Sequence, residues 1–297
     1  MRPDMPCVQK SSSTYIGRMA PTPTGCLHLG HARTFSEAHN RARQAGGRLF
    51  LRIEDLDPLR CKEEFTRAAI DDLRWMGLDW DGDVVLQSRR RQLYLGAWRR
   101  LKEAGHIYPC QRSRREISSL APHEEEPIFP VEWRFDPSEG NALTEPAGVN
   151  WRFRVPDHVA ISFTDQNFGP IEKTALRDFG DFLIWNRDDV PAYELAVVVD
   201  DIDMGITEVV RGADLLLSTV RQILLYRALH AVPPHWFHCP LVCDDFGRRL
   251  AKRTGGLSLQ ELRALGASPA GVLSQASSYM EGNAPTPPDF PCAIVPS

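Results

Sequence analysis

The sequence predicts an α/β fold built on a parallel β-sheet. Strand-like apolar runs alternate with helical repeats through the first hundred residues, and turn residues separate the two. This alternation is typical of βαβ units, in which neighbouring strands are parallel. Such sheets bind ligands outside the carboxyl ends of their strands. Residues 20–25 and Glu54 fall at those ends.

The elements follow from apolar spacing and turn signals, taken in order along the chain. Strands are expected at 15–20, 48–53 and 84–87, alternating with helices at 28–45, 62–76 and 90–104. Residues 151–155 and 161–163 are typical of antiparallel strands. Parallel-sheet strands are expected again at 182–185 and 195–199, then helices at 215–229 and 259–265. Ser258 is the predicted N-cap of the last helix.

Composition describes an ordinary globular protein. A chain of 297 residues that is 42% hydrophobic can bury one large or two modest cores. No apolar run approaches the roughly 20 residues that span a bilayer, and residues 1–14 lack the apolar core of a signal peptide. We therefore expect a cytoplasmic protein with no membrane partner, whose seven scattered cysteines are reduced.

The net charge of −4 excludes a strongly basic protein, but arginine is concentrated locally. The basic side chains of one short stretch are Arg89, Arg90, Arg91, Arg99, Arg100, Lys102, Arg112, Arg114 and Arg115. They could form a solvated helix face, or they could contact an RNA backbone, which adds affinity without sequence information. The sequence leaves both interpretations open.

Residues 18–31 combine a strand end, a Pro/Gly turn and two histidines entering a helix. The first backbone N–H groups of a helix have no partner within it, and the helix dipole favours an anion there. His28 and His31 are three residues apart, so on a helix they share one face and could reach the same phosphate. This pattern predicts a nucleotide-phosphate site.

Two motifs at opposite ends of the chain resemble those of class I aminoacyl-tRNA synthetases. His28-Leu-Gly-His31 is similar to the HIGH motif, and Arg249-Leu-Ala-Lys252-Arg is similar to the KMSKS loop. Residues 52–57, 192–201 and 205–212 resemble glutamyl-tRNA synthetases and, more closely, the shortened glutamyl-Q tRNA(Asp) synthetases. The resemblance covers roughly residues 14–270.

The resemblance implies a Rossmann-like class I catalytic domain with an inserted α+β acceptor-type subdomain, a C-terminal helical segment and no anticodon-binding domain. The implied segments are a disordered N-terminus (1–13), the two catalytic halves (14–110 and 181–240), the insertion (111–180), the KMSKS-like loop with C-terminal helices (241–276) and a flexible tail (277–297).

The resemblance also implies substrates and roles. Glutamate carries two carboxylates and an ammonium, and the planar guanidinium of arginine suits a carboxylate. The glutamate-binding residues implied are Arg18, Ala20, Thr22, Glu54, Tyr193 and Arg211. ATP, accompanied by Mg²⁺, would be bound by His28, Gly30, His31, Asp214 and Lys252, of which the two histidines and the lysine are catalytic.

Some of these side chains have a second interpretation. Arg211 and Glu54 could instead form structural ion pairs. Asp200 and Asp201, placed at the end of the expected strand, could orient these cations without touching substrate.

A zinc site common in this group is degenerate here. The matching positions are Cys110, Arg112, Phe129 and Trp133, and three of these cannot ligate zinc, which needs deprotonated S, N or O donors. His123 is the one nearby replacement, and two ligands do not make a site. We expect no structural zinc, with Phe129 and Trp133 packed into the space.

The implied activity is that of a ligase: activation of L-glutamate as glutamyl-adenylate, with ATP giving AMP and pyrophosphate, then transfer to queuosine in the anticodon loop of tRNA(Asp). A globule of this length has a radius of gyration of about 19 Å, too small to span from the acceptor end of a tRNA to its anticodon. We expect a monomer. Two alternatives remain: a catalytic fragment that charges a tRNA 3′ end, and a non-catalytic RNA-binding paralogue.

Overall fold

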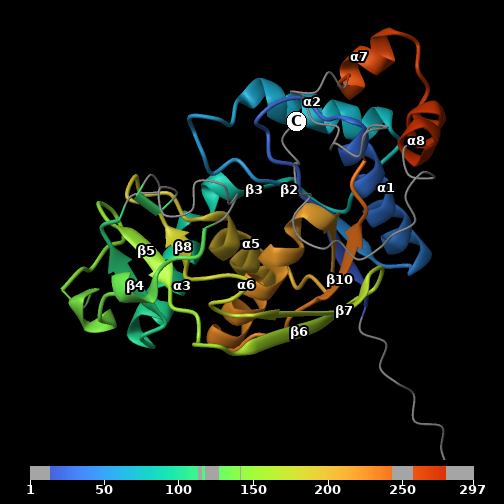
Figure 1. The fold of residues 1–297 in the computed structure, drawn as a ribbon. Helices are drawn as coiled ribbons and strands as arrows, with labels where there is room; N and C mark the ends of the chain where they lie inside the picture. Colours follow the sequence, from blue (N-terminus) through green and yellow to red (C-terminus); the bar gives the residue numbers. More distant parts are fainter. Residues whose placement is uncertain (1–13, 113–115, 118–126, 141, 243–256, 279–297) are drawn as a thin grey trace, which may run out of the picture.

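The structure is a computed structural model, and it describes residues 14–112, 116–117, 127–140, 142–242 and 257–278 (Figure 1). Its first half contains the predicted βαβ units. Strands β1 (Ile16–Met19), β2 (Arg48–Ile53) and β3 (Val85–Leu86) are parallel and adjacent in that order. Helices α1 (Leu29–Gln44) and α2 (Glu63–Trp75) connect them, as the sequence predicts.

A second sheet continues the first. It has the order β7-β6-β10-β9, formed by β6 (Ala160–Asp165), β7 (Gly169–Thr174), β9 (Glu208–Gly212) and β10 (His235–Cys239). Strand β9 lies beside β1, because the Thr207 backbone N–H donates to the Ile16 carbonyl over 2.8 Å. Strands β9 and β10 are parallel, and neither is among the strands predicted from the sequence.

The prediction of a parallel strand at 182–185 is wrong in its direction. Strand β8 (Phe182–Trp185) pairs antiparallel with β5 (Asn150–Phe153), which pairs antiparallel with β4 (Ile107–Cys110). These strands form a separate sheet beside α3 (Arg91–Glu103). A short apolar run shows that a strand is buried, but it carries no information about its direction.

The predicted strand at 195–199 is also wrong, because these residues lie in helix α5 (Tyr193–Asp203). Every residue from Glu194 to Asp201 is buried, so the run has no polar face to reveal a helical period. A continuous apolar run is compatible with a buried strand or a buried helix. Here tertiary packing overrides the strand preference of three consecutive valines.

The remaining helices are α6 (Leu216–Ala228), α7 (Leu259–Ala264) and α8 (Pro269–Ser278), with 3₁₀ turns η1 (Gln87–Arg89), η2 (Val131–Trp133), η3 (Pro137–Gly140) and η4 (Ala213–Leu215). Ser258 caps α7 as predicted, since its hydroxyl accepts the Glu261 N–H. None of the described helices is both long and apolar enough to cross a membrane.

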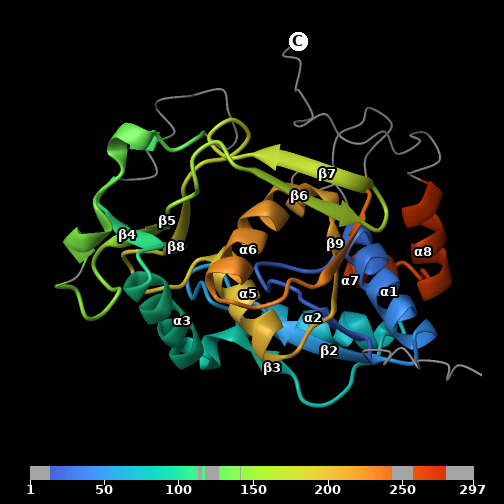
Figure 2. The same cartoon turned by 90° about the horizontal axis from the view of Figure 1, so that it is seen from below.

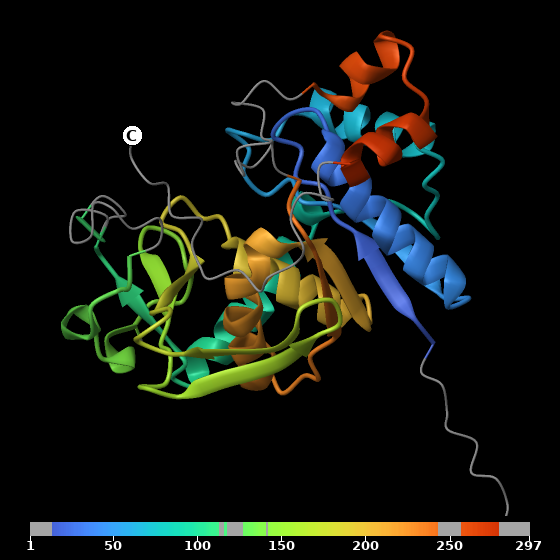
Figure 3. The same cartoon turned by 45° about the vertical axis from the view of Figure 1, so that its right-hand side comes forward.

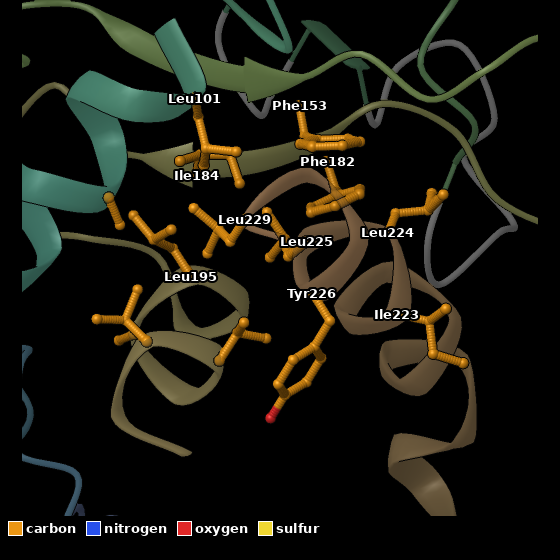
Figure 4. Packing of buried hydrophobic residues seen from close by; sticks show 14 of the residues in the cluster. Leu101, Phe153, Phe182, Ile184, Leu195, Ile223, Leu224, Leu225, Tyr226 and Leu229 are labelled. Atoms are coloured by element: carbon orange, nitrogen blue, oxygen red, sulfur yellow. The ribbon is translucent and has the colours of Figure 1, made fainter. Parts of the chain in front are cut away.

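Two large hydrophobic clusters form the core. One joins α3, α5 and α6 with the antiparallel sheet, and Figure 4 shows Phe153 and Phe182 of that sheet above Leu225 of α6. The other joins β1 and β2 with α1 and α2 and includes Leu259 and Val272. The C-terminal helices therefore pack on the N-terminal ones, as Figure 3 shows. Strands β1 and β9 lie where the two halves meet.

Candidate functional site

The carboxyl ends of β1, β2 and β9 bring together charged side chains from distant parts of the chain. Arg18 ends β1, Arg52 and Glu54 end β2, and Arg211 ends β9; all four are buried. Arg18 reaches across to β9, where Nη1 donates to the Val210 carbonyl over 3.2 Å. The strand ends thus form one polar cluster, at the edge of the sheet that the fold class predicts.

Asp200 and Asp201 lie on α5 and not at the end of a strand. The Asp201 carboxylate lies 2.5 Å from Arg52 Nη1 and 3.3 Å from Arg18 Nε. Asp200 accepts from Gln87, Arg90 and Tyr94. Asp201 therefore orients Arg18, one of the two predicted substrate-binding arginines, whereas Asp200 holds Arg90 and contacts neither Arg18 nor Arg211.

Glu54 forms the structural ion pair that the sequence left open, and it also lies beside Thr22. One carboxylate oxygen lies 3.1 Å from Arg52 Nη2, which is the structural ion pair, and the other lies 3.4 Å from the Thr22 hydroxyl. Burial raises the pKa of Glu54, although Arg52 and Arg18 lower it in part. The adjoining loop is fixed by the Glu54 backbone N–H, which donates to the Pro21 carbonyl beside Ala20.

Arg211 is surrounded differently from Arg18 and Arg52. Its Nε donates to His238 over 3.1 Å, and its Nη atoms contact the Gln222, Tyr193, Thr219 and Leu215 oxygens at 2.7–3.5 Å. All of these partners are neutral when His238 is neutral. No carboxylate of the described residues lies within ion-pair distance of Arg211, so its buried positive charge has no direct counter-ion there.

The two histidines form the start of α1. His28 is the N-cap: its Nδ1 accepts the Gly30 N–H over 3.2 Å, while His31 Nδ1 accepts the His28 N–H over 3.2 Å. His28 thus stands at the entry to the helix, and His31 lies in its first turn. Their ring centroids are 3.9 Å apart, so the rings still lie together. Because each Nδ1 is an acceptor, each neutral ring carries its proton on Nε2.

Gly30 and Gly212 permit close approaches in this region. A Cβ on Gly30 would lie 3.1 Å from the His28 ring, and one on Gly212 would lie 2.5 Å from Asp214 Oδ1. Asp214 lies in the turn η4 that follows β9, three residues after Arg211.

Lys252 lies outside the described residues. Ser258, six positions later in the sequence, forms an isolated β-bridge with His28, and the Leu259 N–H donates to the Leu27 carbonyl over 2.8 Å. The chain that follows the predicted KMSKS-like loop is thus attached beside the first histidine.

The degenerate zinc region contains a small apolar cluster. Tyr108, Cys110, Ile117 and Phe129 are buried together, and Trp133 packs against them with its ring centroid 6.0 Å from that of Phe129. The Arg112 guanidinium lies 4.6 Å from the centre of the Trp133 ring. The described residues contain no group of three potential metal ligands. His123 falls outside them.

Most basic side chains in the described part of the arginine-rich stretch form ion pairs or hydrogen bonds within the molecule. Arg90 pairs with Asp200 and Asp203, Arg91 with Asp189, and Arg99 with Glu145. Arg100 donates to the Leu229 carbonyl, and Arg112 pairs with Glu116. Arg114 and Arg115 lie outside the described residues. These contacts favour internal ion pairing over an RNA-binding face for the described part of this stretch.

Five buried members of the cluster lie outside the predicted set of site residues: Arg52, Asp165, Thr219, Gln222 and His238. Arg52 lies within a quoted motif, two residues before Glu54, and that spacing puts both on one face of β2. The other four lie outside the quoted motifs: Thr219 and Gln222 are 8 and 11 positions from Arg211, and His238 is 27 positions from Arg211 and 73 from Asp165.

Comparisons with known proteins agree with this arrangement. Residues 16–276 match the family described as tRNA synthetases class I (E and Q), catalytic domain. The chain is 44% identical to the glutamyl-Q tRNA(Asp) synthetase of Rhodopirellula baltica, covering 89% of this chain and 84% of that one. It is 45% identical to that of Symbiobacterium thermophilum, covering 94% and 91%.

A solved structure shows the same fold. The glutamate tRNA ligase of Elizabethkingia meningosepticum, in complex with its amino acid, matches with a TM-score of 0.70 at 26% identity, over 86% of this chain and 54% of that one. The chain spans about half the length of that ligase.

Proposed function

The chain belongs to the family of class I tRNA synthetase catalytic domains, and from this we propose that it activates L-glutamate with ATP and transfers the glutamyl group to queuosine in tRNA(Asp). Such an enzyme is a ligase that releases AMP and pyrophosphate. Two of the most similar relatives carry the name of this activity and are covered over most of their length.

The surroundings of Arg211 support the proposal that glutamate binds at this site. A buried cation without a counter-ion is costly, because its charge is removed from water without direct compensation. A substrate carboxylate would supply that counter-ion. The family resemblance gives Arg18 the same kind of role, with Glu54 facing the ammonium and the Tyr193 and Thr22 hydroxyls adding hydrogen bonds, beside the backbone of Ala20.

The start of α1 supports the proposal that ATP binds at this site. When neutral, His28 and His31 both present Nε2–H groups, and the helix dipole adds positive potential at the same end. Ser258 is bridged to His28, and six residues of chain reach at most about 20 Å, so Lys252 can approach the same phosphates. We assign Gly30 and Asp214 to ATP binding with them.

Activation requires attack of the glutamate carboxylate on the α-phosphorus, with pyrophosphate leaving. The residues named stabilise the added negative charge and hold the two substrates in line. Mg²⁺ would arrive with ATP, held mainly by the phosphate oxygens as is usual for this ion. The absence of zinc at Cys110 stays a prediction.

Mapping the attached glutamate on the RNA tests the proposal. The protein is incubated with radiolabelled glutamate, ATP and tRNA(Asp) that carries or lacks queuosine, and the RNA is cut into its anticodon and acceptor fragments. We expect label on the anticodon fragment of the queuosine-containing tRNA alone. Label on the 3′ fragment would instead identify an enzyme that charges tRNA ends. RNA binding without any label would indicate the non-catalytic alternative.

A further inference from the structure

The Arg211 guanidinium is held by a buried pair of side chains that the assigned glutamate site does not include. We propose that His238 and Asp165 are positioning residues, which hold Arg211 in the orientation that receives a substrate carboxylate. This inference rests on the proposed role of Arg211 in binding glutamate.

The three side chains form a continuous hydrogen-bonded chain. His238 lies on β10 and is completely buried, with Nδ1 2.6 Å from Asp165 Oδ2. On the other side of the ring, Nε2 lies 3.1 Å from Arg211 Nε. The order Asp165, His238, Arg211 therefore places the imidazole between a carboxylate and a guanidinium.

This order allows one arrangement of protons. A guanidinium Nε–H can only donate, so His238 Nε2 must accept, and the ring proton must lie on Nδ1, where it is donated to Asp165. Burial lowers the pKa of His238 to about 4, although Asp165 opposes this shift. A protonated ring would direct an N–H group at the Arg211 N–H. The neutral ring with one defined tautomer is thus the form that can orient Arg211.

Asp165 is itself fixed in place. Its carboxylate accepts the backbone N–H groups of Asn167, Phe168 and His238 at 2.9–3.1 Å. It lies where β6 turns into β7, and Figure 2 shows this hairpin lying along α6 toward α1. The other partners of Arg211, Thr219 and Gln222, come from α6. Arg211 thus lies between α6 on one side and His238 of β10 on the other, and the hairpin residue Asp165 holds His238 in place.

The composition of this contact favours orientation over simple core filling. An apolar side chain would fill the space beside Arg211 without the cost of burying a carboxylate and an imidazole. A neutral imidazole supplies the acceptor for Nε without adding a carboxylate that would compete with the substrate. The positive charge of Arg211 therefore remains available.

Two substitutions at His238 separate the two hydrogen bonds. In His238→Gln the amide oxygen can occupy the place of Nε2 and still accept from Arg211, whereas in His238→Asn the amide reaches Asp165 but not Arg211. We expect His238→Asn to raise the KM for glutamate in pyrophosphate exchange roughly tenfold, the effect of losing one hydrogen bond to a charged group. We expect His238→Gln to recover most of this loss, with the KM for ATP unchanged in both.

Asn167→Ala is the matched control, because its amide contacts the backbone carbonyl of His238 and not the ring. It should lower thermal stability without changing the KM for glutamate. An equal rise in both KM values, or no difference between the Asn and Gln variants, would show a purely structural role and overturn the proposal.

If the variants do not fold, nitrogen NMR of the unsubstituted protein still tests the proposal, because it measures the charge and the tautomer of the His238 ring. His238 should stay neutral with its proton on Nδ1 from pH 5 to 8, and an Nε2–H tautomer would overturn the inference. If the unsubstituted protein shows no glutamate-dependent exchange, the proposed function fails, while the NMR result still decides the proton arrangement.

Discussion

The buried charges of the site are compensated in two different ways. Arg18 and Arg52 share Asp201, and Arg52 also meets Glu54, so their charges are balanced within the protein. Arg211 has neutral contacts in place of a carboxylate. This difference between neighbouring arginines indicates that a substrate carboxylate gains the most binding energy at Arg211.

Removing the Arg211 side chain should therefore weaken glutamate use far more than ATP use. We expect Arg211→Ala to lower kcat/KM for glutamate about 100-fold, the effect of losing a charged contact of roughly 3 kcal/mol. Steady-state pyrophosphate exchange measures this. Arg227→Ala, an exposed arginine on the same helix as Thr219, is the control and should stay near the original activity. An unchanged KM for glutamate in Arg211→Ala would remove this residue from the pocket.

A buried carboxylate on α2 gives a pH-dependent prediction. Burial raises the pKa of Asp72 to about 6, and its Oδ2 has no hydrogen-bond partner. The folded protein then binds this proton more tightly than the unfolded chain, so stability is lost as the pH rises from about 4 to about 6. Asp72→Asn should raise the melting temperature at pH 7.5, with the gain vanishing near pH 4. Exposed Asp71→Asn is the control, and an equal gain for both would contradict this reasoning.

Site residues inside motifs could be predicted from the sequence, and those outside motifs could not. Arg18, Glu54 and Arg211 lie in segments with a family pattern, and the structure brings them to one edge of the sheet. His238 is 27 positions from Arg211 and 73 from Asp165. Such contacts arise from tertiary pairing, which local spacing does not encode.

The most informative single element is the start of α1, where helix geometry and the proposed chemistry use the same atoms. His28 caps the helix, and Gly30 leaves room for its ring. Strands and helices with a clear period, such as β2 and α1, lie where the sequence predicts them. Residues 195–199 were predicted as a strand but lie in helix α5, because a helix buried on all sides has no polar stripe to show its period.

Gly30→Ala should lower activity without lowering stability. Alanine favours a helix over glycine by about 1 kcal/mol, but its Cβ would lie 3.1 Å from the His28 ring and displace it. We expect an unchanged or higher melting temperature with a severalfold lower exchange rate. In Gly96→Ala on α3, where a Cβ meets nothing within 4 Å, stability should rise and the rate should stay constant. Equal exchange rates in the two variants would show that Gly30 has no role at the site.

In the molecule as a whole, ion pairs connect the two hydrophobic cores. Asp201 on α5 belongs to the half that contains the antiparallel sheet, whereas Arg18 and Arg52 belong to β1 and β2. Their contacts cross the boundary between the clusters. Substrate binding at this boundary therefore depends on how the halves are held together.

Asp201→Asn should destabilise the whole protein, because it leaves two buried guanidinium groups without their shared carboxylate. Breaking a buried pair by removing one partner costs about 3 kcal/mol or more. Urea unfolding measures the loss. Asp203 lies on the same helix as Asp201 and is a half-exposed partner of Arg90. Asp203→Asn should lower the free energy of unfolding by less than about 1 kcal/mol. Similar losses in both variants would show that Asp201 does not hold the halves together.

The most direct test of the central claim is pyrophosphate exchange with ATP and a single amino acid in the absence of RNA. If the arginine-lined cluster binds glutamate beside the ATP phosphates, glutamate alone should drive the exchange, and glutamine, which lacks the second carboxylate, should not. Exchange with glutamine at an equal rate, or none with glutamate, would contradict the assignment.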